Sequence, residues 1–280
     1  MPITGTSKYV TANGLQLHYL EWGKQDSPIV ILLHGLRGHA HSWDEVSAAL
    51  QEKYHVFAID QRGRGLSEWD PNSNYSTEAY AEDLVQFTKA LSIDRFTLIG
   101  HSMGGRNALM YASQHSDKLS KLGIIDIGPK LDSIGSKRIG DEMATGPTSF
   151  IDIQEVVDHL KTNSKYATVE TLTRRAIYAT KQDETGHFIW SYDPAIRSQR
   201  KTGATESAAN PPDLWPLVSN ISCPTLVFRG MQSDILTEEV ATKMTQIIPD
   251  CNTVAINNAT HTVFEDNPCD FITELKGFLS

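Results

Sequence analysis

The sequence predicts an α/β fold built on a mostly parallel, doubly wound sheet, with a helical segment inserted into it. Three observations support this prediction: short apolar runs alternate with segments of helical periodicity, a hairpin signal lies near the N-terminus, and the alternation is interrupted once, after Pro129. The chain has 280 residues, enough for one large α/β domain that carries an insertion.

The first predicted element is an antiparallel hairpin. Residues 8–22, KYVTANGLQLHYLEW, contain two segments in which apolar and polar residues alternate, joined by Asn13-Gly14. Asn-Gly readily adopts the positive φ angles of a type I′ turn, whose twist matches that of two antiparallel strands. We therefore expect the sheet to begin with a hairpin.

Four buried strands are predicted next. They are the runs PIVILL (28–33), YHVFAI (54–59), RFTLI (95–99) and KLGIID (121–126). Continuous apolar runs of this length are typical of strands buried on both faces of a parallel sheet. A helix is predicted over 76–92, where apolar residues recur at helical spacing and form one stripe: Tyr80, Leu84, Phe87 and Leu91. The repeated order of strand, helix and strand favours right-handed crossovers.

Residues 130–215 are predicted to form a helical cap, inserted between two parts of the core at 1–129 and 216–280. Segments such as SFIDIQEVVDHL and TVETLTRRAIYA have helical periodicity, and buried strand-like runs are missing there. The core pattern then returns with a strand at 223–230, a helix at 237–248, a strand at 253–257 and a closing helix at 271–279.

The net charge of -9 and the pI near 5.5 argue against binding to nucleic acid or to an anionic membrane surface, since both require a basic face. The N-terminus lacks the pattern of a secretory signal, and no apolar run has the length of a membrane span. We therefore expect a cytoplasmic monomer or homodimer. The three cysteines, Cys223, Cys251 and Cys269, form no CxxC pair of the kind that binds metal, so we predict reduced thiols.

The most informative motif is GHSMGG, residues 100–105, directly after the predicted strand 95–99. A serine on a tight turn between a strand and a helix has its hydroxyl exposed at the end of the sheet, and the crowded turn requires small residues two positions before and after it. Gly100 and Gly104 meet this requirement around Ser102. The following helix would point its N-terminal N–H groups at the same place, which favours a developing negative charge. The motif predicts that Ser102 is a nucleophile.

With these residues the chain resembles the α/β-hydrolase family, and the resemblance covers nearly all of its length. His34-Gly35-Leu36 follows the strand 28–33, as does the HG loop of that family. The resemblance implies that the backbone N–H groups of Leu36 and Met103 form the oxyanion hole, and that His34 braces the loop. No metal or organic cofactor is implied.

A serine nucleophile needs a base, and the base needs an acid that orients it. His261 follows the last predicted strand, where the family has its catalytic histidine, and it fits the chain order Ser, acid, His. Two acids remain open. Asp234, after the strand 223–230, has the position used by most family members and is favoured. Asp126, after the strand 121–126, has the position used by a minority and is otherwise expected to fix the cap hinge near Gly128-Pro129.

His101, Arg37 and Trp190 are the candidate substrate-binding residues. Arg106, just inside the nucleophile helix, is expected to bind a substrate carboxylate or to form a surface salt bridge. The resemblance implies hydrolysis of a carboxylic ester of small or medium acyl size, or of a lactone, through a Ser-His-Asp triad and an acyl-enzyme. The partner is then a small-molecule ester. A serine rather than an aspartate at 102 argues against haloalkane dehalogenases and epoxide hydrolases of this fold.

Three other functions stay open at this stage. One is the hydrolysis of a carbon–carbon bond in diketones from ring cleavage, although enzymes of that type commonly have Asn where this chain has His101. Another is the hydrolysis of an amide. The last is a receptor for a small molecule, built on the same scaffold without catalysis.

Overall fold

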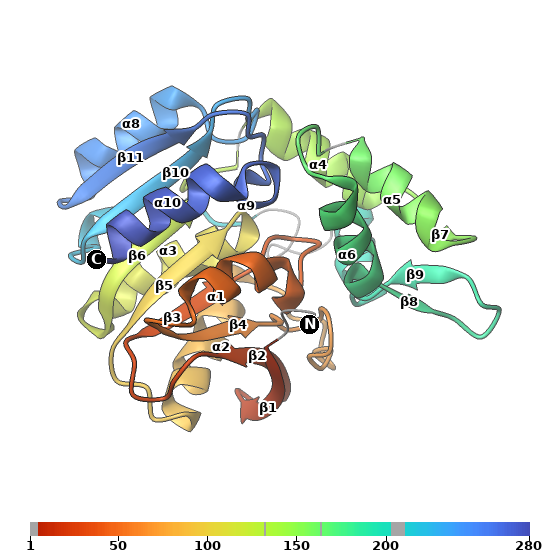
Figure 1. The fold of residues 1–280 in the computed structure, drawn as a ribbon, viewed down its shortest axis with the longest axis horizontal. Coiled ribbons are helices and arrows are strands. Elements are labelled where there is room, and N and C mark those ends of the chain that lie inside the picture. The colour runs from red at the N-terminus through yellow and green to blue at the C-terminus, as the bar shows by residue number, and fades with distance from the viewer. Residues whose placement is uncertain (1–4, 132, 163, 203–210) are drawn as a thin grey trace.

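The computed structural model describes residues 5–131, 133–162, 164–202 and 211–280. In this part of the chain the central sheet has eight strands in the order β1-β2-β4-β3-β5-β6-β10-β11 (Figure 1). The strands are β1 (Thr6–Ala12), β2 (Leu15–Trp22), β3 (Ile29–Leu33), β4 (His55–Ile59), β5 (Phe96–His101), β6 (Leu119–Ile125), β10 (Thr225–Gly230) and β11 (Cys251–Ile256). The pairs β1–β2 and β2–β4 are antiparallel and the others are parallel, which confirms the predicted fold class.

The N-terminal hairpin forms where the sequence predicts it. Asn13 and Gly14 both have positive φ, at 51° and 76°, as a type I′ turn requires. The turn fixes the register between the strands, with Ala12 opposite Leu15. The hairpin then joins the parallel strands through the antiparallel pairing of β2 with β4.

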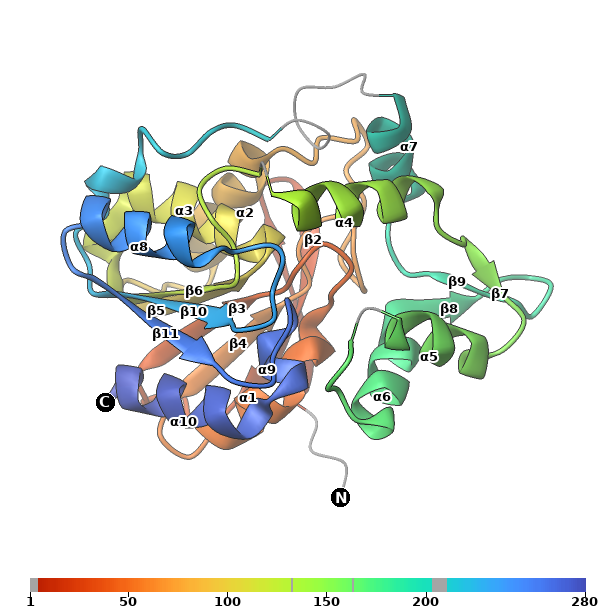
Figure 2. The same cartoon turned by 90° about the horizontal axis from the view of Figure 1, so that it is seen from above.

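Helices cover both faces of the sheet (Figure 2). One layer contains α2 (Thr77–Ala90), α3 (Met103–His115) and α8 (Glu238–Ile247), and the other contains α1 (Asp44–Leu50), α9 (Val263–Asp266) and α10 (Pro268–Leu279). Short 3-10 helices also occur between these elements: η1 (Ala40–Trp43), η2 (Ser116–Lys118) and η3 (Val218–Asn220). No helix within the described residues combines the length and the apolarity that a membrane crossing needs.

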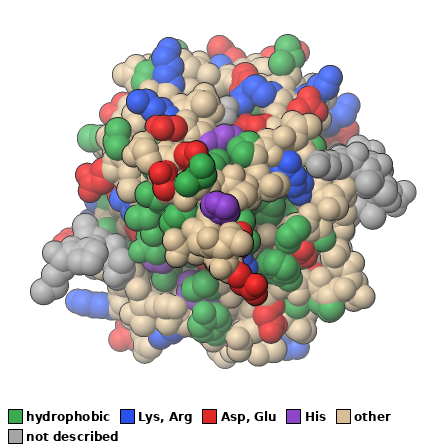
Figure 3. Space-filling view, turned by 90° about the vertical axis from the view of Figure 1, so that its right-hand side faces the viewer, with side chains coloured by type: hydrophobic (Ala, Val, Ile, Leu, Met, Phe, Trp, Pro, Cys, Tyr) green, Lys and Arg blue, Asp and Glu red, His purple; other side chains and the backbone are tan. Residues whose placement is uncertain are grey.

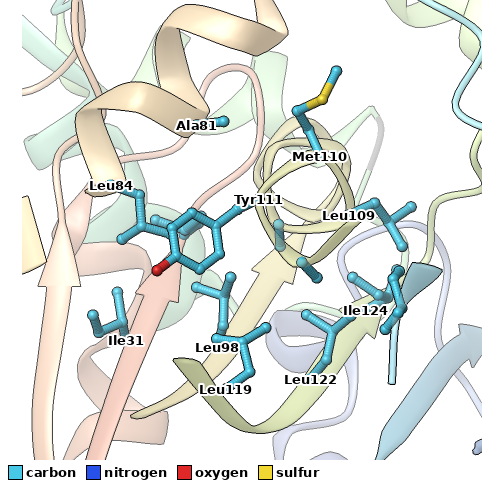
Figure 4. Close-up of a cluster of buried hydrophobic side chains, with 14 of the residues drawn as sticks. Ile31, Ala81, Leu84, Leu98, Leu109, Met110, Tyr111, Leu119, Leu122 and Ile124 are labelled. Atoms are coloured by element: carbon cyan, nitrogen blue, oxygen red, sulfur yellow. The ribbon is translucent and has the colours of Figure 1, made fainter. Parts of the chain in front are cut away.

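The two faces of the sheet have separate cores, because side chains alternate across a strand. On β3, Ile31 belongs to the cluster beneath α2 and α3, whereas Val30 and Leu32 belong to the cluster beneath α1 and α10. Figure 4 shows the first cluster, in which Leu84, Leu98 and Tyr111 lie between the two helices and the strands. Continuous apolar sequence in β3 is therefore the result of burial on both faces.

A second group of elements, called the cap elements below, lies beside the carboxyl ends of the core strands (Figure 1). It contains α4 (Ile134–Thr145), α5 (Ile153–Lys161), α6 (Val169–Ala179) and α7 (Pro194–Thr202), with a three-stranded sheet of β7 (Ser149–Phe150), β9 (Phe188–Trp190) and β8 (Thr180–Gln182). The predicted cap boundaries of 130–215 stay a prediction, and residues 132, 163 and 203–210 of this range lie outside the described residues. Seen from this side, the surface carries apolar side chains between charged ones of both signs (Figure 3).

The small sheet was not predicted from the sequence, which indicates a helical cap over these residues. Its strands β8 and β9 are joined by a turn in which Gly186 has a φ of 86° and the Asp183 carboxylate accepts the N–H groups of Thr185 and His187. Strands of two or three residues are too short to produce a detectable alternation of apolar and polar residues. Their stability comes from Phe150 and Trp190, whose rings pack edge to face.

Candidate active site

Ser102 occupies the turn between β5 and α3 in a backbone conformation that few non-glycine residues adopt. Its φ is 54° and its ψ is -118°, and its N–H donates to the carbonyl oxygen of Ile125 on the neighbouring strand, 3.1 Å away. A Cβ on Gly100 would collide with the carbonyl of Gly104, and one on Gly104 would collide with the carbonyl of Leu33. The small residues around the serine are thus explained by backbone crowding.

His261 lies in the loop between β11 and α9 and contacts Ser102 directly. Its Nε2 is 2.8 Å from the Ser102 Oγ, and its Nδ1 is 2.8 Å from Oδ2 of Asp126. Ser102 is 9% exposed and Asp126 is 0% exposed, so the chain of hydrogen bonds runs from the cavity surface into the interior. An imidazole held between a hydroxyl and a carboxylate in this way is placed to accept the hydroxyl proton.

Asp126 directly follows β6 and has a φ of 51°. Besides His261, its carboxylate accepts the N–H of Gly230, at 3.0 Å, and the hydroxyl of Ser233. Burial raises the pKa of Asp126, whereas the hydrogen bonds from His261, Ser233 and Gly230 favour the ionised form and oppose this effect. Ser233 was not predicted from the sequence, and its position one residue before Asp234 was the only available signal.

The favoured prediction that Asp234 orients His261 disagrees with the structure. Asp234 lies in the loop after β10, and its side chain is 46% exposed and faces α4. There it forms a bidentate ion pair with Arg138, in which Nε is 3.1 Å from Oδ2 and Nη2 is 2.9 Å from Oδ1. This contact lowers the pKa of Asp234. Asp126, at the end of β6, lies beside His261 instead, since the Asp234 carboxylate is directed to Arg138.

The loop after β3 approaches the serine as the predicted oxyanion hole requires. A Cβ on Gly35 would lie 2.8 Å from Nδ1 of His101 and 3.2 Å from the Cβ of Ser102, so a larger residue would displace these side chains or move the loop. Leu36 lines the same cavity as Ser102 and Met103, and Met103 is the first residue of α3, where a backbone N–H has no acceptor within the helix. The oxyanion role of Leu36 and Met103 stays a prediction that these positions allow.

His34 braces this loop as a neutral side chain. Its Nδ1–H donates to the carbonyl oxygen of Gly35 at 2.8 Å, and its Nε2 accepts the backbone N–H of Gln61 at 3.0 Å. Burial lowers the pKa of His34 to about 4, which agrees with a ring that uses one nitrogen as acceptor. Both nitrogens are occupied, so His34 has no free atom for proton transfer.

Two cavities meet at Ser102 and His261. The first cavity is lined by Arg64, Tyr80, Met103 and Arg106 among other residues, and the second by Arg37, His101, His159 and Arg175 among others. Leu36 and Ile139 line both. A substrate bound across the serine can therefore place its two parts on either side of the reacting carbon.

The three predicted substrate-binding residues have different surroundings. His101 lines the second cavity, and its Nε2–H donates to the backbone oxygen of His261 at 2.9 Å; burial lowers its pKa. Arg37 also lines the second cavity and pairs with Glu142 at 3.0 Å. Trp190 lines neither cavity, so its predicted role disagrees with the structure. Its indole N–H donates to the carbonyl of Pro147, and its ring packs inside the cap.

Arg106 is buried and forms no ion pair within the described residues, so the predicted surface salt bridge is wrong. Its guanidinium donates to the carbonyl oxygens of Pro129 and Pro212. Arg106, rather than Asp126, thus contacts the chain segment near Gly128-Pro129. The structure describes no group of three or more His, Cys, Asp or Glu side chains that could hold a metal.

Comparison with known proteins agrees with this geometry. The family model for the alpha/beta hydrolase fold matches residues 28–268. The chain belongs to the α/β-hydrolase family. The 3-hydroxybutyrate-oligomer hydrolase of Cupriavidus necator is 30% identical to this α/β-hydrolase over 253 residues, which cover 87% of this chain and 86% of the relative. An esterase of Mycobacterium tuberculosis is 27% identical over 266 residues, which cover 93% of this chain and 85% of the relative.

The solved structures show the same fold. The crystal structure of E-2-(acetamidomethylene)succinate hydrolase superimposes on this α/β-hydrolase with a TM-score of 0.88 and 23% identity, covering 98% of this chain and 99% of the other. The likeness extends over the cap elements as well as the core, because almost the whole of both chains is aligned. The protein is thus a hydrolase by family, and the named relatives include esterases.

Proposed function

We propose that this protein hydrolyses carboxylic esters through an acyl-enzyme formed on Ser102, with His261 as the base and Asp126 as the acid that orients it. The observation that carries the proposal is the unbroken contact from the Asp126 carboxylate through the His261 ring to the Ser102 hydroxyl, at two distances of 2.8 Å. Relatives named as an esterase and as a hydrolase of 3-hydroxybutyrate oligomers support an ester as the substrate.

The first half of the reaction forms the acyl-enzyme. The Ser102 Oγ attacks the ester carbonyl carbon while His261 Nε2 takes the hydroxyl proton. The carbonyl oxygen becomes negatively charged and accepts the backbone N–H groups of Leu36 and Met103, each of which contributes on the order of a hundredfold to the rate. The bond to the alcohol oxygen then breaks, and Nε2–H protonates the leaving alcohol.

The second half repeats these steps with water. His261 Nε2 takes a proton from a water molecule, the water oxygen attacks the acyl carbon, and the same N–H groups hold the charged oxygen. The bond to Ser102 Oγ breaks, the Oγ regains its proton from Nε2, and the carboxylic acid leaves. Asp126 stays ionised throughout and stabilises the charged imidazole. A lactone presents the same carbonyl group and would be opened by the same atoms.

The test is the hydrolysis of p-nitrophenyl acetate and p-nitrophenyl butyrate by the wild type and by Ser102→Ala. We expect kcat to fall by about six orders of magnitude in the variant. Ser219→Ala, an exposed serine distant from the site in η3, is the matched control and should retain full activity. The wild type should also release a burst of p-nitrophenol that approaches the enzyme concentration, because this good leaving group makes acylation fast and deacylation the slower step.

Two results would contradict the proposal. An unchanged rate in Ser102→Ala would remove the serine from the chemistry. No turnover of any ester by the wild type would instead favour hydrolysis of carbon–carbon bonds, hydrolysis of amides, or a receptor function. Assays on diketones test the first, assays on amides test the second, and ligand binding without turnover tests the third. The cytoplasmic location and the monomeric or homodimeric state remain predictions.

A further inference from the structure

Among its described residues, the wall of the first cavity beside Ser102 has arginines and no carboxylate. Arg64 and Arg106 line it, and none of the described residues that line it is Asp or Glu. Arg64 donates to the carbonyl oxygens of Leu36 and Arg62 and to the hydroxyl of Tyr80. All three partners are neutral. Two guanidinium groups therefore face a largely apolar space, although the whole chain has a net charge of -9.

Arg106 is the less satisfied of the two. It is 3% exposed, and a guanidinium has five N–H donors. Two donors are used, one on the carbonyl of Pro129 at 2.7 Å and one on the carbonyl of Pro212. The Nε is buried and has no hydrogen-bond partner among the described residues. Burial lowers the pKa of Arg106 to about 10, and the charges of Asp213 and Glu78, neither of which forms an ion pair with it, act in the opposite direction. Arg106 is therefore charged at neutral pH. A buried, unpaired charge is costly unless a ligand supplies the missing partner.

The second cavity provides a comparison within the same site. Each of its three arginines is paired: Arg37 with Glu142, Arg138 with Asp234, and Arg175 with Glu265. The arginines of the second cavity thus each have a carboxylate partner. Among the arginines that line the two cavities, Arg64 and Arg106 are the two that form no ion pair within the described part of the chain.

The position of Arg106 limits the size of the ligand. Arg106 lies on α3, four residues after Ser102. Its backbone N–H donates to the backbone carbonyl oxygen of Ser102, 3.0 Å away. Residues four apart lie on the same helix face, about 6 Å apart along the axis. Ile127 and Leu131 add an apolar wall to this cavity. The space next to the serine therefore suits a short aliphatic chain that ends in an anion.

We propose that Arg106 binds a carboxylate of the substrate, so that the preferred substrates are esters with a carboxylate a few carbons from the scissile bond, such as half-esters of short dicarboxylic acids. This inference rests on the proposed function, because it names the substrate class of the same site. A planar guanidinium matches a carboxylate with two parallel hydrogen bonds, and the pairing would neutralise the buried charge.

The test uses pairs of esters that differ only in charge. Monoethyl glutarate is compared with neutral ethyl glutaramate, and O-acetylglycolate with neutral O-acetylglycolamide, which place the carboxylate on the acyl and on the alcohol side. Ester cleavage is followed by pH-stat titration. We expect the wild type to prefer the anion in at least one pair by tenfold or more in kcat/KM. Arg106→Gln should lower kcat/KM for that anion roughly 30-fold and for its amide by less than about threefold.

Two further variants separate charge from structure. Arg106→Lys keeps the charge and should recover part of the preference. Arg95→Gln removes one arginine that bonds Ser120 at the far end of β5 and should change neither member of a pair. Equal losses on the anion and the amide in Arg106→Gln would mean that Arg106 only holds Pro129 and Pro212, and would overturn the inference. So would the absence of a preference in both pairs with the wild type.

A binding measurement on the wild type covers the case in which Arg106→Gln does not fold. Glutarate should inhibit p-nitrophenyl butyrate hydrolysis more strongly than neutral glutaramide does, and equal inhibition would overturn the inference. If the wild type cleaves no ester at all, the proposed function fails. Calorimetric binding of glutarate and glutaramide to Ser102→Ala then still decides whether the first cavity recognises a carboxylate.

Discussion

Asp234 and Arg138 form an ion pair between the loop after β10 and helix α4, with Nη2 and Oδ1 2.9 Å apart. A carboxylate at this position was the favoured candidate for the acid beside His261. In the structure it instead connects the core to the cap elements, and Asp126 contacts His261. The two aspartates follow adjacent strands, β6 and β10, which is why the sequence left both open as the acid.

The first prediction separates the two aspartates. Asp126→Asn should lower kcat for p-nitrophenyl butyrate by about four orders of magnitude, because the neutral amide no longer stabilises the charged imidazole and allows the wrong tautomer. Asp234→Asn should retain kcat within about threefold, since it changes only a half-exposed ion pair. Thermal unfolding of both variants checks that they are folded. A collapse of kcat in Asp234→Asn alone would reverse the assignment.

The sequence predicted most of the core because the deciding information is local. The apolar run of β3 and the Asn13-Gly14 turn specify their structure within a few residues. Ser102 was found in the same way, since the glycines that relieve its crowded turn are two positions away on either side. Local patterns of this kind need no knowledge of what packs against them.

The triad acid and the surroundings of Arg106 could not be predicted, because distant residues decide them. Asp234 faces away from His261 as the partner of Arg138, which lies 96 positions earlier in the chain. The guanidinium of Arg106 donates to the carbonyl groups of Pro129 and Pro212, and Pro212 is 106 positions away in the chain. The sequence pattern predicted whether each of these residues lies in a helix or in a loop. It did not show which residues from distant parts of the chain contact them.

The second prediction concerns two adjacent arginines on α6 that connect the cap elements to the core. Arg175 pairs with Glu265, whose side chain is 6% exposed, and Arg174 pairs with Glu45, whose side chain is 38% exposed. Arg175→Gln should lower the free energy of unfolding by about 3 kcal/mol, because it leaves a buried carboxylate without its partner. Arg174→Gln should lower it by less than about 1 kcal/mol. Urea unfolding of the two variants measures this difference.

The pH dependence of the same pair adds a second readout. Burial raises the pKa of Glu265, and Arg175 acts in the opposite direction, so removal of the arginine should raise this pKa further. A carboxyl group with a raised pKa in the folded state costs stability when it is ionised and not when it is protonated. The loss in Arg175→Gln should therefore be larger at high pH than at low pH. Equal losses for Arg174→Gln and Arg175→Gln at every pH would contradict the burial argument.

The third prediction is a pH dependence that originates at His34. Burial lowers its pKa from the ordinary 6.5 to about 4 in the folded protein. Between these values the unfolded chain binds a proton that the folded chain does not, so stability is present above 6.5 and is lost as the pH falls toward 4. One such proton changes the free energy of unfolding by about 1.4 kcal/mol per pH unit. His34→Gln should remove this contribution, so that stability falls less steeply with decreasing pH. Part of the fall remains, because burial also lowers the pKa of His39 and of His101.

Urea unfolding of the wild type and of His34→Gln across this pH range tests the prediction. His187→Gln is the matched control, because it removes an exposed histidine from the turn between β8 and β9. Its free energy of unfolding should fall with decreasing pH as steeply as that of the wild type. The glutamine can still accept the N–H of Gln61, so the loop keeps one of its two contacts. A fall in stability as steep in His34→Gln as in the wild type would show that His34 is protonated in the folded protein, and its role as a neutral brace of the loop before Ser102 would then be wrong.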